Sequence, residues 1–293
     1  MATALEPWHA EGVHLADVDA ALAELRMEAA AEAPSMRTSV MTHIAWVPHG
    51  WREQARAALE GMAERHPSRT ILLFPEPNAG DSRIDARASV ERWEVPNTGR
   101  GIVTETIELT LRGERAQAPA SIVQELLISD LPVFLRWRGE PPWDAPELEQ
   151  LVGVIDRLIV DSTEWDDLPQ PYARLAELFP QCEASDIAWA RTSRWRAHLA
   201  TLWPGIADVG TVRVTGTAAQ AWLLCGWLRS RLDRPDIGLE HEDAETLEGI
   251  SLDGSTVPLP PGDPPLPSDV LSDELERFTR DPVYEASVLA ASS

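Results

Sequence analysis

The segments DLPVFLRWRG (130–139) and DRLIVDS (156–162), separated by a helical spacer, decide the fold that the sequence predicts. Each contains a short apolar run, Val133 to Trp137 and Leu158 to Val160, bounded by turn-forming and charged residues. Continuous apolar runs of this length are typical of strands buried on both faces of a parallel sheet. We therefore predict two parallel strands joined by a crossover helix.

The rest of the chain continues this alternation of strands and helices. Val40 to Val47, Trp51 to Arg65 and Thr70 to Phe74 predict a strand, a helix and a second strand, which together form one βαβ unit. Ala86 to Val95 fits either a strand or a short helix. We predict an α/β fold with a mixed, largely parallel sheet flanked by helices and with a smaller α+β C-terminal part.

This pattern divides the chain into four segments. Residues 1–36 are predicted to form an N-terminal helical segment, residues 37–205 the α/β domain, and residues 206–255 the smaller α+β part. Residues 256–293 begin with a proline-rich stretch, which is typical of a stiff linker. They end in a helix predicted over Leu271 to Thr279, and we expect this tail to be peripheral to the fold.

The composition excludes several classes of function. With 44% hydrophobic and 25% charged residues, the chain is typical of a soluble globular protein. No apolar run reaches the ~20 residues that span a bilayer, and the first residues lack the pattern of a signal peptide, so we predict a cytoplasmic location. The net charge of −23 repels phosphate backbones and anionic lipids. We therefore predict that the protein binds neither nucleic acid nor membranes.

The residue patterns of catalytic and cofactor sites are absent from the sequence. The 7 histidines and 2 cysteines show no spacing typical of metal ligands. No Gly-x-Ser-x-Gly elbow occurs, and TGRG (98–101) precedes a predicted strand, which is the wrong place for a dinucleotide loop. All 25 basic residues are arginines, which excludes chemistry that needs a lysine. We predict no metal, no cofactor and no catalytic residue.

Asp161 and Ser162 directly follow a predicted strand, at the end where open α/β sheets usually form their binding crevice. Three interpretations stay open for this pair. Both residue types are favoured at helix N-caps and could simply start the next segment. They could also contact a ligand or a partner, or they could position a hydroxyl for catalysis.

Two short segments combine arginine with tryptophan, the residue types that are enriched at interface hot spots. The first segment, at the end of a predicted strand, contains Arg136, Trp137 and Arg138. The second segment, within one predicted helix, contains Arg191, Arg194, Trp195 and Arg196. We predict that these residues contact a partner. In the alternative, the tryptophans pack inside and the arginines pair with the protein's own carboxylates.

Further segments carry a resemblance to a known family. They are RTSVMTHIAWV (37–47), RHPSRTILL (65–73), DIAWARTSRWR (186–196), AWLLCGWLRSRL (221–232) and RDPVYEASVL (280–289). Together with the two segments quoted first, and in matching order, they resemble the OpcA family of glucose-6-phosphate dehydrogenase assembly proteins. The resemblance implies a non-catalytic partner that binds glucose-6-phosphate dehydrogenase and promotes its oligomer assembly or activation in the oxidative pentose phosphate pathway.

Two alternatives to this function remain. The first is a sugar-phosphate or nucleotide-sugar enzyme that uses the crevice near Asp161 and Ser162. The second is a metabolite-sensing protein that binds a small molecule in the same crevice. Arg69, within the RHPSRTI segment, could present a guanidinium at the edge of the sheet in either case.

Overall fold

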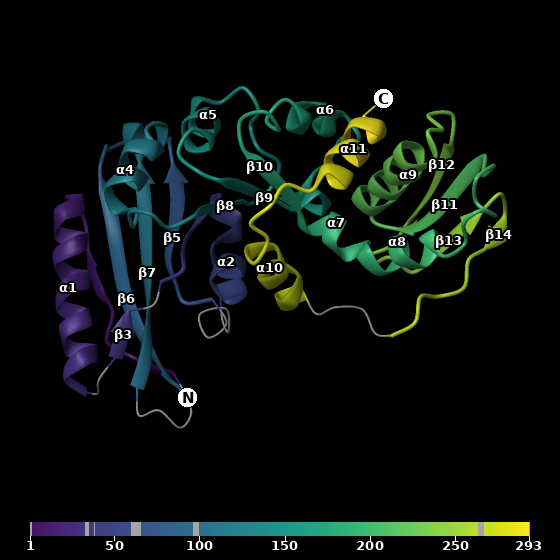
Figure 1. The fold of residues 1–293 in the computed structure, drawn as a ribbon. Helices are drawn as coiled ribbons and strands as arrows, with labels where there is room; N and C mark the ends of the chain where they lie inside the picture. Colours follow the sequence, from purple (N-terminus) through teal and green to yellow (C-terminus); the bar gives the residue numbers. More distant parts are fainter. Residues whose placement is uncertain are drawn as a thin grey trace. The chain divides into compact units, whose positions relative to one another are not determined.

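The computed structural model describes residues 2–32, 35–37, 39–59, 66–95, 100–262 and 267–292, which fall into two compact units (Figure 1). Unit 1 spans Met1–Leu158 and unit 2 spans Ile159–Ser293. Both units combine strands with helices, so the predicted α/β class is confirmed.

Unit 1 is built on a mixed sheet with the strand order β1-β6-β7-β5-β4-β8. The pairs β4–β5, β4–β8 and β5–β7 are parallel, whereas β6 runs antiparallel to β7. Every residue of β4 and β8 is buried, which explains why these strands read as continuous apolar runs. The bounds are β1 (Ala2–Ala4), β4 (Met41–Trp46), β5 (Ser68–Glu76), β6 (Ile84–Val95), β7 (Arg100–Arg112) and β8 (Val133–Trp137).

Two further short strands extend this sheet: β2 (Trp8–Ala10) pairs with β6, and β3 (Ser35–Arg37) pairs with β7. The predicted helical segment 1–36 therefore also contains β1, β2 and the start of β3. Strands of three residues are too short to show an alternating pattern, so the sequence pattern does not predict them. The segment 86–95, which fitted either a strand or a helix, is part of strand β6.

Helices cover both faces of the sheet of unit 1. Helix α1 (Leu15–Glu32) packs on β6 and β7 through Val18, Leu22, Leu25 and Ala29, which recur at helical spacing and are buried. On the other face, Ala55 of helix α2 (Arg52–Leu59) packs in a core cluster with Ala45, Leu72 and Phe74. Among the described residues of unit 1, the other helical segments are η1 (His49–Trp51), η2 (Gly113–Gln117), α4 (Pro119–Leu126) and α5 (Pro146–Val152).

Two sequence predictions fall partly outside the described residues. The helix predicted from Trp51 to Arg65 corresponds to α2 as far as Leu59, and residues 60–65 lie outside the described ranges. The first half of the TGRG segment, residues 98 and 99, also lies outside them.

Unit 2 contains a second, four-stranded sheet with the order β12-β11-β13-β14. Helix α9 (Ala218–Leu232) connects the parallel strands β11 and β12, and a capping box formed by Thr217 and Gln220 starts this helix. The strands are β11 (Thr211–Gly216), β12 (Gly238–Asp243), β13 (Gly249–Leu252) and β14 (Ser255–Thr256). This sheet agrees with the smaller C-terminal part that the sequence predicts.

The first half of unit 2 holds the polar segments that the sequence analysis singled out. Strand β9 (Arg157–Val160) crosses the boundary between the units, and β10 (Glu183–Asp186) lies next to β9 in the strand order. The helical segments here are η3 (Ser162–Glu164), α6 (Gln170–Ala176), α7 (Ile187–Arg191) and α8 (Ser193–Ala200). The β9 strand therefore ends directly before Asp161 and Ser162, as predicted.

The C-terminal tail contradicts the expectation that residues 256–293 are peripheral. Its helices are α10 (Pro267–Leu275) and α11 (Pro282–Ala291), and α11 lies beside α9 (Figure 1). Tyr284, Val288 and Ala291 are fully buried, and a Cβ added at Gly226 of α9 would overlap the Ser287 carbonyl oxygen and lie 2.9 Å from the Ala291 Cβ. The missing side chain at Gly226 thus lets α11 dock on the core.

Candidate functional site

A buried polar cluster occupies the ends of β9 and β10, where the sequence predicts a crevice. The Ser162 hydroxyl donates to a carboxylate oxygen of Asp186 at 2.6 Å and lies 3.0 Å from the Tyr172 hydroxyl. The Ser162 amide donates to the other Asp186 oxygen at 3.1 Å, and the Ala188 amide donates to the same oxygen at 2.8 Å. Ser162, Tyr172 and Asp186 are fully buried, so the Ser162 hydroxyl faces the protein interior.

The two carboxyl groups of this cluster, those of Asp186 and Asp161, have different surroundings. Burial, with a smaller contribution from the neighbouring Asp161 carboxylate, raises the pKa of Asp186 to about 7. Asp161 itself pairs with Arg191 at 3.2 Å and accepts a hydrogen bond from the Thr163 amide at 3.2 Å. Asp161 is the N-cap of η3, so the capping interpretation is confirmed for this residue.

The first arginine–tryptophan segment, at the end of β8, is largely buried. Trp137 stacks on Trp46 with ring centroids 5.1 Å apart and an interplanar angle of 20°. Arg136 is buried and its Nη1 donates to the Trp137 carbonyl at 2.6 Å. Arg138 is half-buried and places its guanidinium 4.5 Å from the centre of the Trp51 ring. The tryptophan of this segment is therefore a core residue.

The second arginine–tryptophan segment spans two helices instead of the single predicted one. Helix α7 ends at Arg191 and α8 begins at Ser193, with Thr192 between them. The Thr192 hydroxyl donates to the Trp189 carbonyl at 2.8 Å, which competes with a continuous helix at this point. Arg191 and Arg194 consequently belong to different helices, and Trp195 is buried.

The arginines of the second segment contact acceptors and rings of unit 2. Arg194 donates to the carbonyls of Pro260 and Pro261 at 3.1 Å each, and also to the Gly262 carbonyl. The Arg196 guanidinium lies 3.4 Å from the centre of the Trp189 ring, and burial lowers the pKa of Arg196 to about 10. The buried Trp195 and the Arg191–Asp161 pair match the alternative of internal tryptophans and arginines paired with carboxylates, whereas the printed contacts of Arg194 and Arg196 are with carbonyls, a hydroxyl and a ring.

Arg69 lies in an ion-pair network in the interior of unit 1. Its Nη2 lies 2.8 Å from Glu105, its Nη1 donates to the Leu126 carbonyl at 2.7 Å, and Arg26 of α1 lies 3.4 Å from the same carboxylate. Arg69 therefore ties β5 to β7 and to the end of α4.

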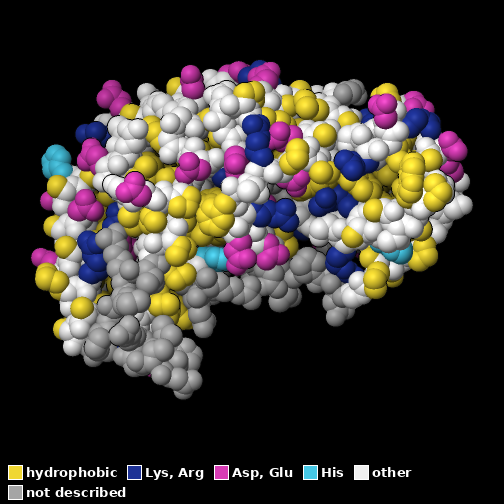
Figure 2. All heavy atoms as spheres, viewed as in Figure 1, with side chains coloured by type: hydrophobic (Ala, Val, Ile, Leu, Met, Phe, Trp, Pro, Cys, Tyr) yellow, Lys and Arg dark blue, Asp and Glu magenta, His cyan; other side chains and the backbone are white. Residues whose placement is uncertain are grey.

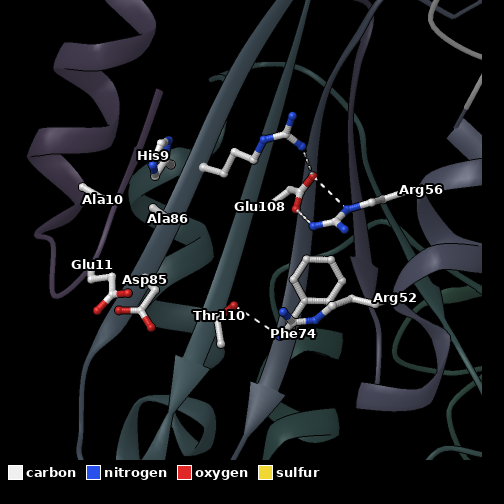
Figure 3. Close-up of a pocket in the computed structure, with 11 residues that line it drawn as sticks. His9, Ala10, Glu11, Arg52, Arg56, Phe74, Asp85, Ala86, Glu108 and Thr110 are labelled. Atoms are coloured by element: carbon white, nitrogen blue, oxygen red, sulfur yellow. Dashed lines mark hydrogen bonds and ion pairs between the residues drawn. The ribbon is translucent and has the colours of Figure 1, made fainter. Parts of the chain in front are cut away.

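The structure also forms a pocket that the sequence analysis missed, here called the arginine pocket (Figure 3). Its volume is about 210 Å³, and it lies over β5, β6 and β7 beside α2. The side chains that define it are Arg52 and Arg56 of α2, Phe74 of β5, Arg87 of β6 and Glu108 of β7. Arg52 and Arg56 have the i, i+4 spacing of one helix face, and this signal was present in the sequence.

Comparison with known proteins identifies the family to which this chain belongs. Residues 60–178 match the family model described as the glucose-6-phosphate dehydrogenase subunit N-terminal domain, and residues 182–259 match the corresponding C-terminal domain. The two models together cover most of the chain. The chain belongs to the OpcA family.

Three curated cyanobacterial relatives carry the provisional name OxPP cycle protein OpcA. The protein from Nostoc punctiforme is 25% identical over 197 residues, which are 63% of this chain and 42% of the relative. The proteins from Synechocystis and Synechococcus elongatus are 24% and 26% identical, over 62% and 63% of this chain and 40% and 44% of their own lengths. The chain thus matches about two fifths of the length of these OpcA relatives.

Within the described ranges, no group of three or more histidine, cysteine or acidic residues is arranged to hold a metal ion. Nor does any described helix have the length and apolar character to span a membrane.

The arginine pocket only partly overlaps the OpcA match. Phe74, Arg87 and Glu108 lie within residues 60–178, whereas Arg52 and Arg56 precede that range. The family description therefore does not account for the helix that supplies two of the three arginines.

Proposed function

We propose that this chain is a non-catalytic partner that binds glucose-6-phosphate dehydrogenase and promotes its oligomer assembly or activation in the oxidative pentose phosphate pathway. The observation that carries the proposal is the match of two consecutive models, both described as domains of a glucose-6-phosphate dehydrogenase subunit. The buried position of Ser162 also supports a non-catalytic role, because a nucleophile must reach its substrate.

The physical mechanism is selective binding to one state of the dehydrogenase. A partner that binds the active oligomer more tightly than the inactive form shifts the population toward the active oligomer. A preference of about 1.4 kcal/mol shifts that equilibrium about tenfold. No chemistry by the partner is required.

In this proposal, the exposed parts of each arginine–tryptophan segment, one in each unit, contact the dehydrogenase. Arg138, Arg191 and Arg194 keep part of their side chains accessible, and each is held in place by a ring, a carboxylate or backbone carbonyls. Trp137 and Trp195, which lie next to two of these arginines in the chain, are buried. Arginines fixed in this way lose less side-chain entropy when they bind a partner.

Trp203 is a further candidate for this partner surface. Its side chain is 62% exposed, which is unusual for a large apolar ring. Tryptophan is enriched among interface hot spots because it buries a large area when a partner covers it. We expect Trp203→Ala to weaken binding of the dehydrogenase by about 2 kcal/mol or more without reducing the stability of the chain.

The test is a turnover assay with purified proteins. The chain alone should convert neither glucose 6-phosphate nor 6-phosphogluconolactone, whereas its addition should raise the activity of the dehydrogenase from the same genome. Turnover by the chain alone, lost in Asp161→Asn, would favour the alternative enzyme. An unchanged dehydrogenase activity at saturating amounts of the chain would contradict an activating role.

On the face shown in Figure 2, arginine and acidic side chains are interspersed, and neither sign of charge forms a continuous field.

A further inference from the structure

Three guanidinium groups converge on the arginine pocket from two directions (Figure 3). Arg52 and Arg56 project from one face of α2, and Arg87 projects from β6. Phe74 lies among them, with its ring centre 4.3 Å from the Arg52 guanidinium carbon and 5.8 Å from that of Arg56. The pocket thus combines an aromatic surface with three permanent positive charges.

Glu108 fixes two of these arginines. Arg56 Nε lies 3.2 Å from one carboxylate oxygen of Glu108, and Arg56 Nη2 donates to the other oxygen. Arg87 Nη1 donates to Glu108 at 3.0 Å. The Glu108 carboxylate is nearly buried, but the Arg56 and Arg87 side chains are each 46% exposed. Each guanidinium has five N–H groups, so both keep donors for a ligand in the pocket.

Arg52 is held in a similar way. Its Nη2 donates to Glu76 at 3.2 Å and to the Thr110 hydroxyl at 3.3 Å. Its Nε is buried and has no hydrogen-bond partner among the described residues.

The acidic groups that line the pocket are already occupied. Asp85 pairs with Arg83 at 2.9 Å and accepts from the Gly12 amide at 3.0 Å. Glu11 pairs with Arg83 at 3.0 Å, and Glu108 serves Arg56 and Arg87. The lining therefore carries equal numbers of arginines and carboxylates, but each of these carboxylates already has an arginine partner.

We propose that the arginine pocket binds the phosphate group of a small phosphorylated molecule. A carboxylate is planar and is satisfied by one guanidinium fork, whereas a phosphate presents three charged oxygens to donors from different directions. The volume of about 210 Å³ is below the roughly 300–1,000 Å³ of drug-sized ligand sites, so it suits a single phosphate monoester or phosphate alone.

Glu108 acts in this site as a positioning residue. It holds the Arg56 and Arg87 guanidiniums close together despite their like charges, so the ligand does not need to order them. Phosphate binding at this pocket requires only the isolated chain and does not involve the dehydrogenase.

The test is isothermal titration of the full chain with inorganic phosphate, with glycerol 3-phosphate and with glycerol. We expect saturable binding of the two phosphate compounds and none of glycerol. Equal affinities would identify free phosphate as the ligand, and tighter binding of glycerol 3-phosphate would identify a phosphate monoester. The absence of saturable phosphate binding up to about 10 mM would overturn the proposal.

Variants locate the site. The double substitution Arg56→Gln and Arg87→Gln should weaken phosphate binding at least tenfold, whereas Arg115→Gln, at an exposed arginine of η2 in the same unit, should leave it unchanged. Unchanged binding in the double variant would overturn the assignment to this pocket. As a check independent of folding of the variants, phosphate should shift the Nε–Hε NMR signals of the wild-type arginines in this pocket, and unshifted signals at saturation would also overturn it.

Discussion

Unit 1 and unit 2 each bury a carboxylate at a strand, but they compensate its charge differently. Glu105 of β7 is fully buried and lies 2.8 Å from Arg69 and 3.4 Å from Arg26. Asp186 at the end of β10 is equally buried, but its hydrogen bonds come from neutral donors, the Ser162 amide and hydroxyl and the Ala188 amide. The first carboxylate has permanent cationic partners, and the second has none in direct contact among the described residues.

This difference determines how each unit responds to mutation and pH. A carboxylate paired with arginines depends on both partners, because removal of one leaves a buried charge without full compensation. A buried carboxylate with neutral donors can instead take up a proton near neutral pH, and the pKa of Asp186 is raised to about 7 by burial. We therefore expect the largest mutational effect in unit 1 and a pH effect in unit 2.

The largest expected effect is that of Arg69→Ala. Because Arg69 is the closer partner of Glu105 and also binds the Leu126 carbonyl, its loss should reduce the free energy of unfolding by about 3–5 kcal/mol. Urea denaturation at pH 7 measures this. The double variant Arg69→Met with Glu105→Leu should recover much of the loss, since it removes the charge with its partner. A loss of unfolding free energy below about 1 kcal/mol in Arg69→Ala would show that the buried Glu105 carboxylate does not depend on Arg69.

The second prediction concerns the pH dependence of Asp186. Its pKa in the folded state, about 7, lies above the ordinary value of 3.8, so the folded protein binds this proton more tightly than the unfolded chain. The resulting stabilisation is complete below about pH 4 and is lost as pH rises through 7. Relative to Asp186→Asn, the wild type should lose about 2–3 kcal/mol between pH 5 and pH 8.

Urea denaturation of the two proteins at several pH values measures this difference. Asparagine keeps an acceptor for the two amides and cannot ionise, so it is a matched control. Parallel pH profiles for the two proteins would show that Asp186 does not titrate in this range.

A smaller effect is expected for Arg194→Ala with Arg196→Ala. Loss of the carbonyl contacts of Arg194 and of the ring contact of Arg196 should reduce the free energy of unfolding by about 1–2 kcal/mol. We also propose that the double variant weakens binding of the dehydrogenase by about 1–3 kcal/mol. Arg213→Ala, which removes only an exposed pair with Glu240, is the control and should cost less than about 1 kcal/mol. Normal affinity in the folded double variant would exclude these arginines from the partner surface.

The strands that form the middle of the sheet were predictable because their apolar runs are continuous. β4, β5 and β8 appear within a few residues of the predicted bounds, since burial on both faces leaves a strong signal. The short strands β1, β2 and β3 and the docking of α11 were not predicted. Docking of α11 depends on the fit of its apolar face to Gly226, which a pattern along the chain does not reveal.

The candidate sites depend on residues that are distant in the sequence, so the pattern of neighbouring residues does not predict them. Arginine next to tryptophan in the chain predicts an interaction surface, but Trp137 and Trp195 are buried. The arginine pocket, in contrast, joins Arg56 and Arg87 through Glu108, and these residues become neighbours only when α2, β6 and β7 pack together. The i, i+4 spacing of Arg52 and Arg56 indicated a shared helix face, but not the strand residues opposite it.

We propose that this chain acts by binding glucose-6-phosphate dehydrogenase, and the decisive test is sedimentation velocity of the dehydrogenase with and without the chain. We expect a complex that contains both proteins and a dehydrogenase population shifted toward its larger, active oligomer. Independent sedimentation of the two proteins, with an unchanged oligomer distribution at saturating amounts of the chain, would contradict it.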